Sequence, residues 1–250
     1  MGASWYDKRP SWHDVLLFLQ RMNIRSGDAV CGGYASAPNT DGFNVGGHRI
    51  TIVDSTVHNG DDCIPVTSGN DGTTTDVYVG NIRCMCGTNG GVVYDQGGKV
   101  SNVTFDNIYV YGTNQGAGVK LSRPGRNATG GRVANVVWKN VRIDRPRNAA
   151  LYFNVFQEDA PWPCKGPADP ALRSWLSIEN VLFQNVTATL IEKSQPAGCF
   201  LCTPGAPCTA TFDAVSIRGA DGKLVPAYAC ENLKETSHGG SMPDRCRPVP

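Results

Sequence analysis

Apolar and polar positions alternate along this chain in a pattern that recurs. Four ten-residue segments show the pattern most clearly: TDVYVGNIRC (75–84), SNVTFDNIYV (101–110), ANVVWKNVRI (134–143) and ENVLFQNVTA (179–188). Each contains a valine, an aromatic residue or valine two positions later, and then an asparagine followed by Ile or Val. Alternation with a period of two, rich in β-branched and aromatic residues, is typical of strands. The pattern therefore predicts a series of strands separated by turns rich in Gly, Asn and Asp.

The copies recur along most of the chain. Two looser ones, RITIVDSTVHN (49–59) and TATFDAVSIR (209–218), extend the series at both ends. A repeat whose strands are too short to bury a core alone predicts an all-β solenoid of stacked coils, in which equivalent asparagines form an amide ladder. The alternative is a β-sandwich with accidental similarity, which four copies of one frame disfavour.

The remaining segments give no sign of a second domain. Residues 12–25, WHDVLLFLQRMNIR, have a composition that a helix or a degraded coil could share, and we favour the coil. Residues 157–174 are rich in proline and lack alternation, which predicts a long loop inserted between coils. We therefore expect residues 1–250 to form one β-solenoid domain.

Composition narrows the class of partner. The formal net charge is +1, without a block of like charge, so neither nucleic acid nor a membrane surface is an expected partner. No stretch is long enough to span a bilayer. A small molecule or a polymer of modest charge is expected instead, bound by a monomer without a cofactor or metal.

Cysteines and sequons favour an exported protein. The chain has ten cysteines, and its one CxxC, at 199–202, lacks the further ligands of a zinc site. A disulfide framework is the better interpretation, and the sequons at Asn102, Asn127 and Asn185 agree with it. The opening MGASWYDKRP is not an apolar signal segment, so we expect the secretion signal to be missing from this chain.

Three acids form the candidate catalytic group. Asp41 lies in NTDGFNV (39–45), and Asp61 and Asp62 are adjacent in HNGDDCI (58–64). Residues about 20 apart can stack within one coil spacing of a solenoid, so the three are expected to share one surface. Clustered carboxylates split their pKa values, which glycoside hydrolysis requires. Taken singly, each acid could equally be a turn former.

These motifs resemble the polygalacturonase family of glycoside hydrolases, family 28. The resemblance rests on NTDGF (39–43) and GDDC (60–63), and continues through CGTNGGVVYDQGG (86–98), GAGVK (116–120) and CTPGAPC (202–208). Members of that family fold as a right-handed parallel β-helix and cleave pectin with inversion. Because a stretch of β-helix precedes the first motif in the family, the resemblance also implies that this chain lacks N-terminal coils.

The resemblance implies a role for each candidate residue. Asp61 would be the general acid, and Asp41 and Asp62 would hold and deprotonate the attacking water, while Asn39 and Lys120 would bind substrate. It also implies three disulfides, Cys63–Cys86, Cys202–Cys208 and Cys230–Cys246.

The chain departs from the family pattern at two positions. Gly90 aligns with the family's histidine, and Gly118 aligns with its arginine, although Lys120 is retained. A rhamnogalacturonan-cleaving branch of the family also lacks both residues, but its acid pair often reads Asp-Glu. The alternatives are therefore a galacturonan hydrolase, a rhamnogalacturonan-type hydrolase and a pectin-binding pseudoenzyme, with a purely structural solenoid least favoured.

Overall fold

The computed structural model describes most of the chain as stacked β-coils. It describes residues 16–26, 31, 37–68, 72–95, 98–121, 131–155, 164, 176–192, 195–202, 205–206, 208–225, 227–240 and 246–248. The strands are β1 (Leu17–Gln20), β2 (Asn23–Arg25), β3 (His48–His58), β4 (Ile64–Thr67), β5 (Thr73–Met85), β6 (Asn89–Asp95), β7 (Lys99–Tyr111), β8 (Gln115–Leu121), β9 (Arg132–Asp144), β10 (Ala149–Asn154), β11 (Ser177–Thr189), β12 (Gly198–Leu201), β13 (Cys208–Arg218), β14 (Tyr228–Glu231), β15 (Leu233–Gly240) and β16 (Cys246–Pro248).

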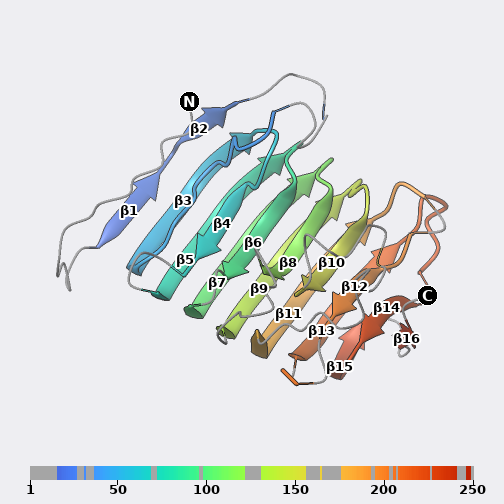
Figure 1. The fold of residues 1–250 in the computed structure, drawn as a ribbon. Helices are drawn as coiled ribbons and strands as arrows, with labels where there is room; N and C mark the ends of the chain where they lie inside the picture. The colour runs from blue at the N-terminus through green and yellow to red at the C-terminus, as the bar shows by residue number, and fades with distance from the viewer. Residues whose placement is uncertain are drawn as a thin grey trace.

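Two parallel sheets run along the solenoid and enclose one core (Figure 1). The nine-stranded sheet has the order β1-β3-β5-β7-β9-β11-β13-β15, with β2 also paired to β3. The seven-stranded sheet has the order β16-β14-β12-β10-β8-β6-β4. Each coil therefore contributes one long strand to the first sheet and one short strand to the second. The prediction of an all-β parallel β-helix is confirmed.

Asparagines bend the long strands at regular positions. Asn81, Asn107, Asn140 and Asn185 have φ between 51° and 56°, a left-handed conformation that asparagine tolerates better than most residues. Their side chains form the expected ladder in part: Asn107 donates to Asn81 and Asn185 to Asn140, both at 2.7 Å. Asn140 departs from it, because its amide donates to Asp106 Oδ1. The repeated asparagine is thus both a bend and a link between coils.

A second row of bends precedes the first one. Asn102, Asn135 and Asn180 also have positive φ, and each donates to the preceding member of the row, beginning at Asp76, over 3.2 Å. The two rows divide each long strand into short straight segments. That division lets one strand wrap around the core instead of crossing it.

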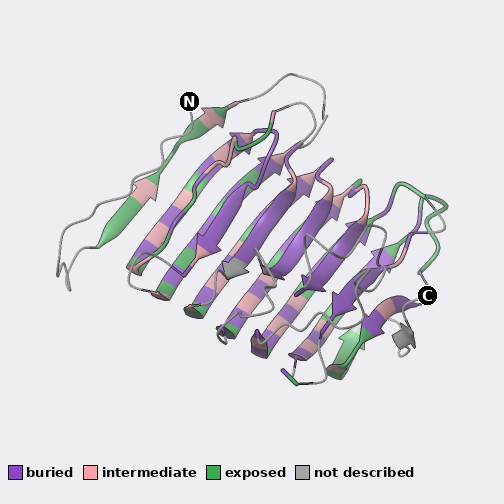
Figure 2. Ribbon diagram, in the orientation of Figure 1, coloured by how far each residue is buried: buried purple, intermediate pink, exposed green. Residues whose placement is uncertain are grey.

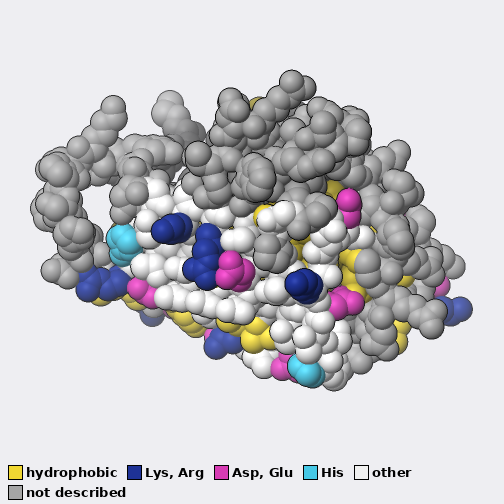
Figure 3. Space-filling model, turned by 60° about the horizontal axis from the view of Figure 1, so that its bottom comes forward, with side chains coloured by type: hydrophobic (Ala, Val, Ile, Leu, Met, Phe, Trp, Pro, Cys, Tyr) yellow, Lys and Arg dark blue, Asp and Glu magenta, His cyan; other side chains and the backbone are white. Residues whose placement is uncertain are grey.

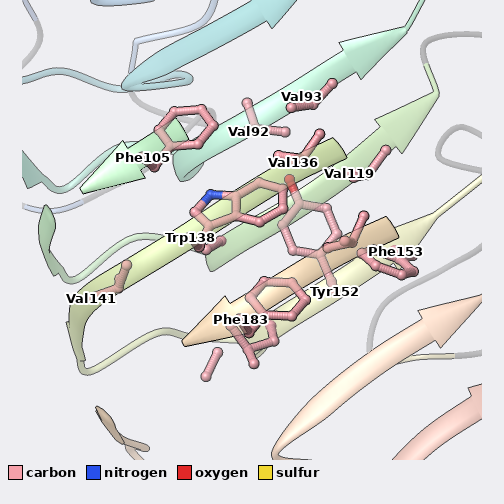
Figure 4. Packing of buried hydrophobic residues seen from close by; sticks show 14 of the residues in the cluster. Val92, Val93, Phe105, Val119, Val136, Trp138, Val141, Tyr152, Phe153 and Phe183 are labelled. Atoms are coloured by element: carbon pink, nitrogen blue, oxygen red, sulfur yellow. The ribbon is translucent and has the colours of Figure 1, made fainter. Parts of the chain in front are cut away.

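The core is a column of aromatic rings. Phe105, Trp138, Phe183 and Phe212 occupy equivalent positions on β7, β9, β11 and β13, and successive rings stack 5.0–5.5 Å apart. Figure 4 shows Phe105, Trp138 and Phe183 in line, with Phe153 of β10 beside them. All four stacked side chains are fully buried. Among the short strands, β10 and β12 are wholly buried as well (Figure 2).

The N-terminal segment forms strands, as the coil interpretation predicted. β1 and β2 both pair with β3, and exposed apolar side chains of this segment include Phe18 on β1 and Met22 between the two strands. The predicted loop at 157–174 lies outside the described residues except for Cys164, which is bonded to Cys199.

One predicted disulfide is wrong. Cys63 bonds to Cys84, whereas Cys86 bonds to Cys31. Cys84 is a buried residue on β5, while Cys86 lies beyond the strand end with φ 69°, so only Cys84 points into the coil that Cys63 occupies.

The two other predicted pairings fare differently. The bond between Cys202 and Cys208 is confirmed. Cys230 is disulfide-bonded, but the side chain of its predicted partner, Cys246, lies outside the described residues.

The asparagines of two of the three sequons donate hydrogen bonds within the asparagine ladders. Asn102 Nδ2 donates to Asp76 and Asn185 Nδ2 to Asn140, and this nitrogen is the atom to which a glycan would attach. We therefore expect neither residue to be glycosylated when the chain passes through a eukaryotic secretory pathway. Peptide mass spectrometry after enzymatic deglycosylation in heavy-oxygen water would measure this. Occupancy at either site would contradict the expectation, and Asn127 lies outside the described residues.

Candidate active site

Asp41 and Asp62 lie side by side on neighbouring coils. Gly42 N donates to Asp62 O at 2.9 Å and Phe43 N donates to Cys63 O at 3.0 Å, so residues 41–45 run parallel to β4 as a further coil. On the other side, Cys63 N donates to Asn89 O at 2.8 Å. The row of equivalent positions is thus Asp41, Asp62 and Asn89, with neighbours about one strand spacing apart, roughly 4.8 Å.

Asp61 is held by two backbone amides. Its Oδ2 accepts from Asn39 N at 2.8 Å, and its Oδ1 accepts from Asp62 N at 2.9 Å. The carboxyl group is buried. Asn39 therefore contributes its backbone to the site, while its own side chain is exposed. The turn thus escapes strand alternation and orients both adjacent acids.

Asp62 carries the direct charge partner of the cluster. Lys120 Nζ lies 2.5 Å from Asp62 Oδ2, and Asn89 Nδ2 donates to Asp62 Oδ1 at 2.5 Å. All three side chains are buried, and Lys120 comes from β8, two coils beyond Asp62. A buried ion pair of this kind is held only where further hydrogen bonds satisfy it, which Asn89 does here.

The carboxyl groups of Asp41 and Asp61 retain protons at a higher pH than carboxyl groups usually do. Burial, followed by the charges of Asp62 and then Asp61, raises the pKa of Asp41 from 3.8 to about 6. Burial and the charge of Asp62 also raise the pKa of Asp61, against the two amides that stabilise its ionised form. Three carboxyl groups facing one lysine cannot all ionise easily, so the site holds at least one exchangeable proton in mildly acidic solution.

A cavity of about 240 Å³ adjoins the acids. Apart from Lys120, every lining residue has an amide or hydroxyl side chain. The lining residues are Thr88, Asn89, Asn114, Gln115, Lys120, Asn148, Tyr152 and Asn154. Neutral groups that donate and accept hydrogen bonds suit the hydroxyls of a sugar.

Gly90 and Gly118 stand where the family pattern has a histidine and an arginine, and neither position has room for the larger side chain. A Cβ at Gly118 would lie 2.0 Å from Tyr152 O and 2.6 Å from Tyr152 Cδ1, since Tyr152 pairs with Gly118 on the next coil. A Cβ at Gly90 would lie 2.5 Å from Val110 Cγ2 and 2.6 Å from Gly116 O. Neither an arginine at 118 nor a histidine at 90 could be accommodated without moving the backbone.

The sequence did not single out Asn89, which the structure places against Asp62. The Asn-Gly-Gly context resembles an ordinary turn, so the residue type alone gave no signal. Its position one residue before Gly90 was the available clue. Among the predicted residues, Asp41, Asp61, Asp62 and Lys120 do come together, while their roles stay predictions.

Replacing Asp41 with Asn is expected to stabilise the fold at neutral pH. Its pKa of about 6 in the folded state exceeds the unfolded value near 3.8. Between these two pH values the folded state therefore binds more protons than the unfolded state, and the free energy of unfolding falls as the pH rises through them. Asp41→Asn removes that loss, a gain of about 1–2 kcal/mol at pH 7 after allowance for solvent screening, and little at pH 4.

Urea unfolding of both proteins at pH 4 and pH 7 would measure the difference. Asp76→Asn is the matched control, because Asp76 is exposed on the outer face of β5. Equal effects of Asp41→Asn at both pH values would contradict the prediction.

Comparison with known proteins agrees with this geometry. The sequence pattern described as Glycosyl hydrolases family 28 matches residues 13–239. The chain belongs to this family. Family 28 relatives include Polygalacturonase QRT2 of Arabidopsis thaliana, 26% identical over 91% of this chain and 50% of that protein. Endopolygalacturonase D of Aspergillus niger is 31% identical over 84% of this chain and 41% of that protein.

Solved structures share the fold of this chain. An exopolygalacturonase from Thermotoga maritima superposes with a TM-score of 0.63 at 15% identity, covering 91% of this chain and 47% of that one. An endo-xylogalacturonan hydrolase from Aspergillus tubingensis gives 0.58 at 21% identity, covering 88% and 57%. The chain spans about half the length of these relatives.

The described surface is mixed in charge. On the face drawn in Figure 3, basic and acidic side chains lie next to one another. The described residues contain no helix long and apolar enough to cross a membrane. They also contain no group of His, Cys, Asp and Glu that could hold a metal ion.

Proposed function

We propose that this chain hydrolyses α-glycosidic bonds in a galacturonate-containing pectic polysaccharide, with inversion at the anomeric carbon. The observation that carries the proposal is the carboxyl cluster of Asp41, Asp61 and Asp62, in which the pKa values of Asp41 and Asp61 are raised. Inverting hydrolysis needs one carboxyl group that gives a proton and another that takes one from water.

The proposed roles follow the family resemblance. Asp61 protonates the glycosidic oxygen, and Asp41 and Asp62 hold and deprotonate the attacking water. The raised pKa values support a cluster that retains a proton for the acid step, and the contact of Lys120 with Asp62 supports an ionised partner for the base step. Asn39 and Lys120 are proposed to bind the substrate as well.

The family context supports the substrate class. The relatives are named as polygalacturonases, and one structural neighbour is named as a xylogalacturonan hydrolase. The four disulfides between described cysteines support action in an oxidising compartment, and we propose an extracellular monomer.

A second candidate is a rhamnogalacturonan-type hydrolase. The observation that favours it is the packing of Tyr152 against Gly118, which leaves no space for the arginine of the standard pattern. A polymer in which only alternate sugars carry a carboxylate would need fewer cations in the cavity.

Reducing-end release from polygalacturonate and from rhamnogalacturonan tests both candidates. Proton NMR of short oligosaccharides during turnover follows the anomer that forms first. We expect the β-anomer to appear first from an α-linked substrate. Initial appearance of the α-anomer would overturn inversion, and no release from either polymer would overturn the proposed hydrolase.

A further inference from the structure

We propose that Arg147 binds the carboxylate of a sugar next to the scissile bond and so supplies the cation that position 118 cannot. The inference rests on the proposed function, because it takes the substrate to be a uronate-containing chain. It assigns a specificity-determining role to a residue outside the family motifs quoted above.

The backbone of Arg147 is fixed at the edge of the cavity. Arg147 N donates to Thr113 O at 2.9 Å, on the preceding coil. From the other side, the buried amide of Gln195 donates to the carbonyl oxygens of Pro146 and Arg147. Contacts on both sides hold the turn before β10 in one position, so the guanidinium starts from a fixed point.

The side chain of Arg147 reaches back over the cavity lining. Its Nη1 donates to Asn114 Oδ1 at 3.1 Å, and both Asn114 and the adjacent Asn148 line the cavity. The side chain is partly buried. One of its five N–H donors is used in this bond, which leaves donors for a planar carboxylate that a guanidinium can bind with two parallel hydrogen bonds.

Carboxyl groups outnumber cations among the described residues around the three acids. Lys120 is paired with Asp62, and two further carboxyl groups lie beside them. In the described part of the chain the ion pairs join other residues, and Arg147 has no carboxylate partner there. An anionic sugar would therefore meet repulsion at the acids and attraction at Arg147.

The spacing places Arg147 beside a neighbouring sugar and not at the reacting one. Thr88 N donates to Asp61 O on one coil, and Gln115 N donates to Thr88 O on the next. Asn114, under the guanidinium, is thus two coils from Asp61, roughly 10 Å at a strand spacing of about 4.8 Å. A polysaccharide chain lying along the solenoid axis would present its next carboxylate on this side.

The test compares Arg147→Gln and Arg147→Lys with the wild-type chain on two substrates. On polygalacturonate we expect Arg147→Gln to raise KM by roughly 10–100-fold with little change in kcat, and Arg147→Lys to lie between. On highly methyl-esterified pectin, which lacks most of the carboxylates, the same variants should differ from wild type by less than about threefold. Arg142→Gln is the control, because Arg142 is exposed and paired with Asp144 on the other sheet.

Binding separates this inference from the proposed function. In an Asp61→Asn background, calorimetry with oligogalacturonate measures affinity without turnover, and thermal melting checks that each variant is folded. A folded Arg147→Gln variant with unchanged KM and affinity for the de-esterified substrate would overturn the role of Arg147. An equal loss on both substrates would overturn it too, since a structural defect would not distinguish them. If the wild-type chain binds oligogalacturonate through Arg147 but releases no reducing ends, only the hydrolase proposal fails.

Discussion

Asp61→Asn is expected to lower kcat on polygalacturonate by about 10²–10⁴-fold, because an amide cannot deliver a proton to the leaving oxygen. The fold should persist. The amide oxygen can keep one of the two backbone hydrogen bonds, from Asn39 N or Asp62 N, and the loss of the other is offset by reduced repulsion with Asp62. Reducing-end assays with purified variants measure the effect, with circular dichroism as the check on folding.

The control for this variant is Asp76→Asn. Asp76 begins the outer amide ladder, where asparagine occurs at each of the next positions, so the change should leave activity within about twofold. Retention of more than a tenth of wild-type kcat by Asp61→Asn would show that another group donates the proton.

Trp138→Ala is expected to lower the free energy of unfolding by about 3–5 kcal/mol. Trp138 is the second ring of the four-ring column, stacked between Phe105 and Phe183, and it is fully buried. Its removal leaves a cavity that touches three coils at once. Guanidinium unfolding followed by circular dichroism measures the loss, and a change below 1 kcal/mol would contradict the packing described.

Trp138→Phe separates packing from hydrogen bonding at the same position. In the described part of the chain, Trp138 Nε1 has no hydrogen-bond partner. A phenylalanine keeps the stack and removes this buried donor, so the loss of volume and the relief of an unpaired group oppose each other. We expect a net change within about 1.5 kcal/mol.

The sequence predicted the coils because their signal is local and repeated. The valine, the aromatic residue and the asparagine of each copy lie at fixed offsets, and the structure puts Phe105, Trp138 and Phe183 in one column. Coil-to-coil pairing then followed from the repeat itself. Equivalent positions are 26 residues apart from Val79 to Phe105, 33 from Phe105 to Trp138 and 45 from Trp138 to Phe183. This variation did not obscure the pattern, because the extra residues fall between strands.

The contacts that cross between coils were harder to predict. Cys84 and Cys86 are two residues apart, and choosing the partner of Cys63 requires the exact end of β5, where Cys86 turns away. Asn140 likewise bonds to Asp106 and not to Asn107, a choice between adjacent acceptors that spacing does not determine.

The residues of the candidate site also fall into those that local motifs predict and those that only contacts between coils reveal. The acids are carried by short motifs and could be predicted, and the structure brings them together. Asn89 and Arg147 donate hydrogen bonds to residues on other coils, Asp62 and Asn114. Their position is set by the stacking of coils, which a single stretch of sequence does not reveal.

The insertions that lengthen two of the coils have a common starting point. Residues 122–131 connect β8 to β9 and residues 155–176 connect β10 to β11, so each connection follows a short strand that carries a residue of the cavity lining, Lys120 on β8 and Asn154 on β10. The bends, ladders and aromatic column lie on the long strands and are untouched by changes in these connections. The same two junctions are therefore natural places to graft new loops onto this scaffold without altering the repeat.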